Sequence, residues 1–335
     1  VHQKYYLWAR VWSQIGSLKT TESYLDKALA VKADYPAALH LKGLVHISRR
    51  HEDPSRITDG LKSLSAAREY EPRNPRILLS LSLAHEFSHQ PAESIRFASQ
   101  AVSLSPDDPL LWSNLADLLQ RHHALNEAAQ AYRKALALIP SDPRLLNNLA
   151  FTLLELGQES GAALTLARES VRLLPNAAFN LDTLAWAYHK NGMHAEALET
   201  IREARTLASG SLEIDFHFGV IAMACGVLAN PISFFTELGS RPELALDTQL
   251  QHRLVDVLAS LTSTIASPST GPFPKSETRP ATETPRLTHG PASSATSASP
   301  LEPIAASSTS ASATVAAPSD IPSTAPQSLP ESSSP

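Results

Sequence analysis

A spacing of 34 residues between similar segments constrains the fold of this chain more than any other feature of its sequence. The clearest pair is PLLWSNLADLLQRHHALNEAAQAYRKALALIPSD, from Pro109, and PRLLNNLAFTLLELGQESGAALTLARESVRLLPNA, from Pro143. Each segment holds two stretches with apolar side chains at helical spacing. Such self-similarity indicates a chain built from stacked copies of one supersecondary unit, because a single copy cannot bury its apolar face alone.

The repeat resembles the tetratricopeptide repeat (TPR) family, whose 34-residue unit is a helix-turn-helix with small residues where its two helices cross. Aligned to that family, the units begin near His2, Pro36, Pro75, Pro109, Pro143, Ala178 and Leu212. Consensus position 8 holds Ala9, Gly43, Ser82, Ala116, Ala150, Ala185 and Gly219, and position 27 holds Ala28, Ala67, Ala101, Ala135, Ser170 and Ala204. The resemblance implies an all-α fold, a right-handed α-solenoid of about seven units followed by a disordered tail.

The chain divides into three regions. Residues 1–241 form the predicted TPR solenoid, in which Pro231 interrupts the last helix, so we expect that helix to restart there with Asn230 as its N-cap. Residues 242–265 have the pattern of an amphipathic helix that caps the last apolar face. Residues 266–335 are almost wholly Ser, Thr, Pro and Ala, with too little apolar surface to offset their ordering entropy, and are predicted to be disordered.

Composition narrows the class of partner. The formal net charge is -5, and no stretch concentrates Lys and Arg on one face, so we expect no nucleic acid. The longest apolar run, residues 218–229, is too short to cross a bilayer, which predicts no membrane insertion within this fragment. A single cysteine, Cys225, excludes an internal disulfide and leaves the compartment open between cytoplasm and bacterial periplasm. Because the first residue is Val1, we expect a fragment or a processed form whose targeting region is not visible.

The stretch HEFSH, residues 85–89, has the spacing of a zinc-protease signature, with two histidines four apart and a glutamate beside the first. The repeat register argues against that interpretation. His89 occupies consensus position 15, where the first helix ends and the family prefers a left-handed glycine, and Pro91 follows at once. We therefore expect His89 in a turn, away from the helical face that carries His85. No metal site is predicted.

Other catalytic signatures are missing from the sequence. It contains no nucleophile elbow, no glycine-rich phosphate loop and no Cys-His pair, and seven repeats occupy nearly all of the residues expected to fold. We predict that the chain is not an enzyme and requires no cofactor.

Binding is expected on the concave side, where side chains at consensus positions 2, 5, 6, 9, 12 and 13 point into a groove. Asn114 and Asn148 recur at position 6, where an amide can hydrogen-bond to the backbone of an extended peptide. Phe151 and Trp186, both at position 9, offer apolar or aromatic anchors. The alternative is that Asn147 and Asn148 lie on a solvated face and that Trp186 fills space between units. The candidate partner-binding residues are Asn114, Asp117, Arg121, Asn147, Asn148, Phe151, Asp182, Trp186, His189 and Lys190.

Two functions from different classes remain open. The main hypothesis is a protein-protein interaction scaffold that holds a peptide segment or a partner protein in the concave groove. The alternative is the substrate-presenting accessory region of a larger enzyme or envelope-assembly machine. The terminal repeats, around NNLAFTLLELGQ and NLDTLAWAYHKNG, resemble those of bacterial envelope-associated TPR proteins. The identity of the partner, the pathway and the oligomeric state are left undetermined.

Overall fold

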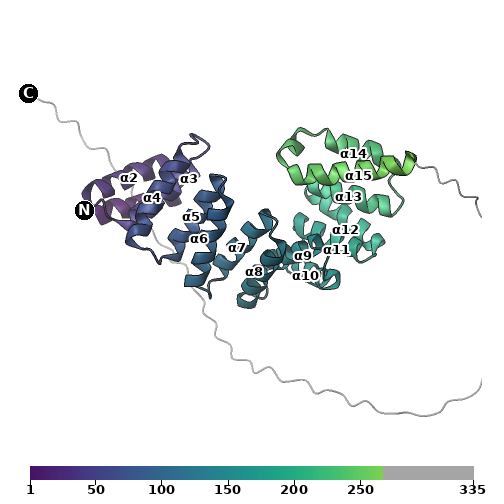
Figure 1. Ribbon diagram of the computed structural model, residues 1–335, viewed down its shortest axis with the longest axis horizontal. Helices are drawn as coiled ribbons and strands as arrows, with labels where there is room; N and C mark the ends of the chain where they lie inside the picture. Colours follow the sequence, from purple (N-terminus) through teal and green to yellow (C-terminus); the bar gives the residue numbers. More distant parts are fainter. Residues whose placement is uncertain (267–335) are drawn as a thin grey trace, which may run out of the picture. The chain divides into compact units, whose positions relative to one another are not determined.

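The computed structural model of the protein describes residues 1–266. Within them the chain forms fifteen α-helices and one 3-10 helix, and no strand (Figure 1). The predicted disordered tail, residues 266–335, lies outside the described residues except for Ala266. In chain order the helices are α1 (His2–Gln14), α2 (Leu18–Val31), α3 (Pro36–Ser48), α4 (Arg56–Tyr70), α5 (Pro75–Phe87), α6 (Pro91–Leu104), α7 (Pro109–Arg121), α8 (Leu125–Leu138), α9 (Pro143–Glu155), α10 (Ser160–Leu173), α11 (Ala178–Lys190), α12 (His194–Leu207), α13 (Leu212–Ala224), α14 (Pro231–Gly239), η1 (Pro242–Leu246) and α15 (Thr248–Ala266).

Consecutive helices pair into seven hairpins, from α1 with α2 to α13 with α14. The second helix of each hairpin packs on the first helix of the next, so the hairpins form one continuous stack (Figure 1). This arrangement confirms the predicted all-α solenoid of repeated helix-turn-helix units. The first helices of the hairpins begin at His2, Pro36, Pro75, Pro109, Pro143, Ala178 and Leu212.

Small residues allow the two helices of each hairpin to cross closely. A Cβ added to Gly43 would lie 2.5 Å from Cγ of Leu64, and one added to Gly219 would lie 2.5 Å from a ring carbon of Phe234. A third set of small buried residues, on the second helices, was not predicted. These residues are Thr21, Gly60, Ser94, Ala128, Ala163 and Ala197.

The turn inside the third hairpin shows whether the two histidines of HEFSH, residues 85–89, lie on one helical face. Helix α5 ends at Phe87, and His89 follows in the left-handed conformation with φ of 55°. His85 stacks on Phe97 with ring centroids 5.2 Å apart, and its Nδ1 lies 2.7 Å from Oε1 of Gln90. The two histidines therefore do not share a helical face, because φ at His89 turns the chain away from the α5 axis. In residues 1–266 no group of three His, Cys, Asp or Glu side chains is placed to hold a metal ion.

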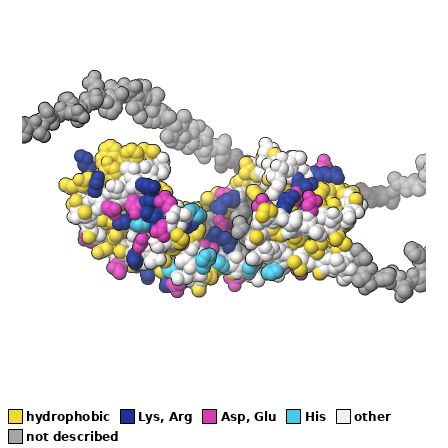
Figure 2. Space-filling view, turned by 90° about the horizontal axis from the view of Figure 1, so that it is seen from above, with side chains coloured by type: hydrophobic (Ala, Val, Ile, Leu, Met, Phe, Trp, Pro, Cys, Tyr) yellow, Lys and Arg dark blue, Asp and Glu magenta, His cyan; other side chains and the backbone are white. Residues whose placement is uncertain are grey.

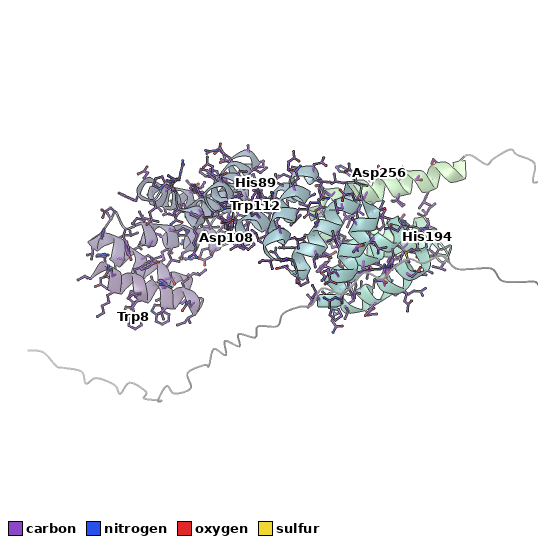
Figure 3. The ribbon with its side chains drawn as sticks, turned by 90° about the horizontal axis from the view of Figure 1, so that it is seen from below. Trp8, His89, Asp108, Trp112, His194 and Asp256 are labelled. Carbon is purple, nitrogen blue, oxygen red and sulfur yellow. The ribbon has the colours of Figure 1, made fainter. Side chains whose placement is uncertain are left out.

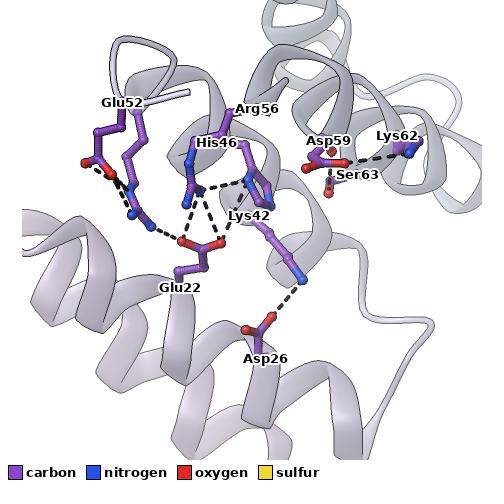
Figure 4. Close-up of polar contacts among 10 residues, drawn as sticks. Glu22, Asp26, Lys42, His46, Glu52, Arg56, Asp59, Lys62 and Ser63 are labelled. Carbon is purple, nitrogen blue, oxygen red and sulfur yellow. Dashed lines mark hydrogen bonds and ion pairs between the residues drawn. The ribbon is translucent and has the colours of Figure 1, made fainter. Parts of the chain in front are cut away.

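Charged side chains join the first two hairpins (Figure 4). Glu22 of α2 contacts the guanidinium of Arg49 and lies 3.3 Å from that of Arg56. At the same junction Lys42 of α3 pairs with Asp26 of α2 at 2.7 Å. Cations of the second hairpin thus meet carboxylates on the second helix of the first hairpin.

The C-terminal end of the stack is covered. Asn230 accepts a hydrogen bond from the backbone N–H of Ser233 at 3.1 Å, so it caps α14 as predicted. The segment predicted as one helix, 242–265, is instead the 3-10 helix η1 followed by α15. Asp247 separates the two, because its carboxylate accepts from the N–H of Leu250 at 2.9 Å and starts a new helix. The apolar cluster beneath this cap contains Phe216, Phe235, Leu238, Leu244, Leu250 and Leu254. No helix within residues 1–266 is both long and apolar enough to span a membrane.

Candidate functional site

The main candidate site is a groove of about 630 Å³. Helices α7 and α9, the first helices of hairpins four and five, form one wall. The other wall comes from α13, from Asp247 and from the first turns of α15. We call residues 242–266, which comprise η1 and α15, the cap. The lining residues are Asp117, Gln120, Arg121, His123, Leu125, Asn148, Phe151, Glu155, Glu213, Asp247, Gln249, Leu250, His252 and Arg253.

Asp117 is the most connected side chain of the first wall. Its Oδ1 accepts from the hydroxyl of Tyr132 at 2.6 Å and from Nδ2 of Asn148 at 3.2 Å, and its Oδ2 lies 3.1 Å from the guanidinium of Arg144. Tyr132 is fully buried, and its burial together with the adjacent carboxylate raises the pKa of its hydroxyl. Tyr132 therefore stays a donor, and the carboxylate of Asp117 is held in one orientation.

The groove is lined by both apolar and charged side chains. Phe151 on α9 is partly exposed, and Leu125 and Leu250 line the groove with it. Four carboxylates face two guanidinium groups. Both guanidinium groups already have acidic neighbours, since Arg121 lies 3.7 Å from Glu86 and Arg253 lies 3.9 Å from Glu213. The groove thus combines an apolar patch with an excess of negative charge. The carboxylates are those of Asp117, Glu155, Glu213 and Asp247.

The cap reaches back from the end of the stack to hairpin four. The side-chain amide of Gln249 contacts the imidazole of His123, although 126 residues separate them in the chain. His123 follows α7 in the left-handed conformation, with φ of 59°, which places its ring at the end of the first wall. The groove is therefore bounded on two sides by segments distant in sequence.

Behind the cap, a chain of stacked rings occupies the concave face of hairpin six. Trp186 is only 6% exposed, and its indole stacks on His217 and His189, with centroids 4.4 Å and 5.1 Å away. Lys190 lies over the same ring, 4.7 Å from the centroid. Burial, followed by the neighbouring His194, lowers the pKa of His189 to about 4.

His217 joins this aromatic cluster to the cap. Its Nδ1 lies 2.9 Å from the carboxylate of Asp182, and its Nε2 lies 2.9 Å from the guanidinium of Arg253. Because a guanidinium only donates, Nε2 accepts and Nδ1–H donates to Asp182. His217 and Asp182 are both buried, at 0% and 4% exposure. They therefore serve as support for the cap.

No protein-family model matches the chain, and no curated protein matches it. Among solved structures, a tetratricopeptide repeat protein from Parabacteroides merdae is similar with a TM-score of 0.57 at 14% identity, over 77% of this chain and 98% of that one. PilF of Pseudomonas aeruginosa is similar with a TM-score of 0.51 at 15% identity, over 68% of this chain and 97% of PilF. The chain has the tetratricopeptide repeat fold. At these identities the likeness concerns the fold alone.

In this TPR solenoid, four of the ten candidate residues line the groove: Asp117, Arg121, Asn148 and Phe151. Asn114 donates to the carbonyl of Leu110 on its own helix at 2.7 Å, and Asn147 has a buried Oδ1 without a hydrogen-bond partner among the described residues. Neither lines the groove. The four candidates of hairpin six lie in or beside the aromatic cluster instead, and they are Asp182, Trp186, His189 and Lys190.

Sequence reasoning missed the second wall of the TPR groove. Glu213, Gln249 and Arg253 were not among the candidates. The repeat register does not extend to Gln249 and Arg253, whereas Glu213 holds consensus position 2 of the seventh unit, a groove position that the register does identify. One local signal was present: Asp247 stands before a run of helical pattern, which is typical of an N-cap. That signal predicts a break in the cap, but not the side of the stack to which the following helix folds.

Proposed function

We propose that this TPR solenoid is a protein-interaction scaffold that binds an extended peptide segment of a partner protein in the groove between hairpins four and five and the cap. The groove itself supports this function most strongly, because it is concave and combines an apolar patch with a few oriented polar groups. A solenoid of this kind presents its inner surface for partner binding.

Each part of the lining has a distinct role in this proposal. Phe151, with Leu125 and Leu250 beside it, receives one apolar side chain of the peptide. The carboxylate of Asp117 and the amide of Asn148 hydrogen-bond to the peptide backbone, which is recognition that tolerates different side chains. Tyr132 and Arg144 fix the orientation of Asp117 before binding, so less ordering entropy is lost when the peptide arrives.

Charge selects among peptides. The four lining carboxylates outnumber the two guanidinium groups, so a segment that carries Lys or Arg is favoured over an acidic one. The same excess disfavours an acidic chain end as the ligand. We therefore infer a preference for basic segments with one apolar anchor.

A random peptide library displayed on phage tests this function with the full chain as bait. Peptides selected by the wild-type protein are expected to contain Lys or Arg together with a large apolar residue. Their affinity is expected to fall at least about tenfold in Phe151→Ala, the loss typical of truncating a central anchor. Asn114→Ala is the matched control, because Asn114 occupies the same register position as Asn148 but lies outside the groove.

The measurement contradicts the proposal in two cases. The first is that no peptide is enriched above background. The second is that Phe151→Ala and Asn114→Ala bind the selected peptides as tightly as the wild type, while circular dichroism shows that both variants are folded.

A further inference from the structure

A separate cavity of about 440 Å³ lies at the junction of hairpins six and seven. Helix α12, which begins at His194 (labelled in Figure 3), ends beside this cavity. The turn to α13, the first turn of α13 and the residue that follows α14 complete the wall. The lining includes three guanidinium groups, those of Arg202, Arg205 and Arg241, and one carboxylate, that of Asp215. The cavity and the peptide groove share no lining residue.

Two of these charged residues depart from the repeat pattern. Asp215 is the fourth residue of its unit, a position that is apolar or aromatic in the six earlier units, yet it is only 4% exposed. The position of Arg205 is apolar in every earlier unit except the second. The equivalents of Asp215 are Tyr5, Leu39, Leu78, Trp112, Leu146 and Leu181, and those of Arg205 are Leu29, Arg68, Val102, Leu136 and Val171. Stacking of the units therefore does not require a charged pair at this junction.

The buried carboxylate fixes two guanidinium groups at the cavity wall. Nε of Arg205 donates to Oδ1 of Asp215 at 2.7 Å, and Nη1 of Arg241 lies 2.8 Å from Oδ2. Arg205 also lies over the ring of Phe218, 4.1 Å from its centroid. A buried ion pair is rarely more stabilising than apolar residues of similar volume. What this pair adds is orientation, because both Nη groups of Arg205 and Nη2 of Arg241 are left without an acceptor in residues 1–266.

The cavity keeps an excess of positive charge. Its lining has a formal charge of +2, because three guanidinium groups face one carboxylate. On the face shown in Figure 2, Lys and Arg side chains at the C-terminal end of the stack lie beside Asp and Glu side chains. Arg202 is exposed and forms no ion pair within the described part of the chain, and neither Glu199 nor Glu203 of the same helix lines the cavity. A dianion balances this charge, whereas a carboxylate balances half of it.

We propose that this cavity binds a phosphoryl group, carried either by free phosphate or by a phosphorylated side chain of a partner. A phosphoryl group has a charge of about -1.5 to -2 at neutral pH and three acceptor oxygens. Guanidinium groups match those oxygens with paired N–H donors. Arg205 and Arg241 are held ready by Asp215, Arg202 supplies the charge that has no partner, and the hydroxyl of Ser209 adds a donor.

Isothermal titration calorimetry of the full chain with inorganic phosphate, in a chloride buffer at neutral pH, tests this site. We expect saturable binding that weakens at least about tenfold in Arg202→Gln, because a charge-assisted contact is lost. Arg168→Gln is the matched control and is expected to bind as the wild type. Arg168 is likewise exposed and holds the same register position one unit earlier, but it lies over Tyr188 and outside the cavity.

A second variant separates binding from stability. Arg205→Leu with Asp215→Leu introduces at this junction the apolar residues that most other units have. We expect this double variant to keep the circular dichroism and the urea midpoint of the wild type, since apolar residues replace a buried ion pair without loss. Phosphate binding is expected to disappear. Binding that persists in the folded double variant would overturn the proposal.

Titration with N-acetylphosphoserine amide identifies the source of the phosphoryl group. If it binds more tightly than inorganic phosphate, the site receives a modified partner; if phosphate binds more tightly, the ligand is the free anion. The proposal fails if the folded wild type binds neither compound, if acetate binds equally well, or if Arg202→Gln and Arg168→Gln weaken binding equally. Arg202→Gln is expected to bind the peptides selected for the groove as the wild type does, so the two proposals fail independently.

Discussion

The guanidinium of Arg253 lies 2.9 Å from Nε2 of the buried imidazole of His217, 36 residues away in the chain. This contact connects the cap to the concave face of hairpins six and seven. Arg253 also lies over the rings of Phe216 and Trp186, at 4.7 Å and 5.7 Å from their centroids. The second wall of the groove therefore depends on one side chain that satisfies a buried acceptor and covers two aromatic rings.

Replacing Arg253 with methionine tests this dependence. Arg253→Met keeps much of the apolar packing but leaves Nε2 of His217 buried without a donor, which costs about 1–3 kcal/mol. Hydrogen exchange in the first turns of α15 is expected to accelerate, and the groove loses affinity for selected peptides. Arg202→Met, at an exposed position on α12, is the control and changes stability by less than about 0.5 kcal/mol. Unchanged exchange in α15 of Arg253→Met would show that the contact does not hold the cap.

The pH dependence of stability follows from His189. Its pKa is lowered from 6.5 to about 4 in the folded chain, so between these values the unfolded state binds a proton that the folded state does not. Stability is therefore complete above pH 6.5 and falls as the pH drops toward 4. Burial also lowers the pKa values of His40 and His46, which adds to the same trend.

Urea unfolding at several pH values between 7.5 and 4.5 measures this trend. We expect the free energy of unfolding to decrease over this range, and the decrease to be smaller in His189→Gln. Nuclear magnetic resonance of the His189 ring should show a midpoint near pH 4, as the lowered pKa requires. A midpoint near 6.5 would mean that the aromatic cluster does not bury this imidazole.

The left-handed turn after α5 predicts a stabilising substitution. His89 has φ of 55°, a conformation that is unfavourable for a residue with a Cβ and open to glycine. His89→Gly is expected to raise the free energy of unfolding by about 0.5–1 kcal/mol. This is a net value, because the greater conformational entropy of glycine in the unfolded chain opposes part of the gain. The reverse change, Gly157→Ala, places a Cβ on a residue with φ of 64° and is expected to destabilise by about 1 kcal/mol. Thermal and urea unfolding of both variants check the pair, and equal midpoints would show that the turns are not strained.

The structural features that could be predicted from the sequence are those determined by residues within a single repeat. The turn at His89 and the N-cap at Asn230 were predicted correctly, because local backbone geometry and a 34-residue register determine them. Ala9 and Gly43 were predicted as crossing residues for the same reason, since only a small side chain fits between two closely crossing helices.

The features that sequence did not determine depend on contacts between distant segments. Trp186 has the register of a groove residue, yet the stacked His217 and the cap cover it, which no repeat consensus describes. The contact between Gln249 and His123 spans 126 residues and depends on the curvature of the whole stack. The first wall of the groove was thus predictable from register, and the second required the tertiary structure.

Hydrogen exchange of the full chain, with and without a peptide selected from the library, tests the groove most directly. The account predicts that the peptide slows exchange in α7, α9 and the first turns of α15 together, because these elements form the two walls. It predicts no change in α10, or in α8 beyond its first turn, because these segments lie outside the groove. Protection confined to other helices, or protection of α7 and α9 without α15, would contradict a binding site between the repeats and the cap.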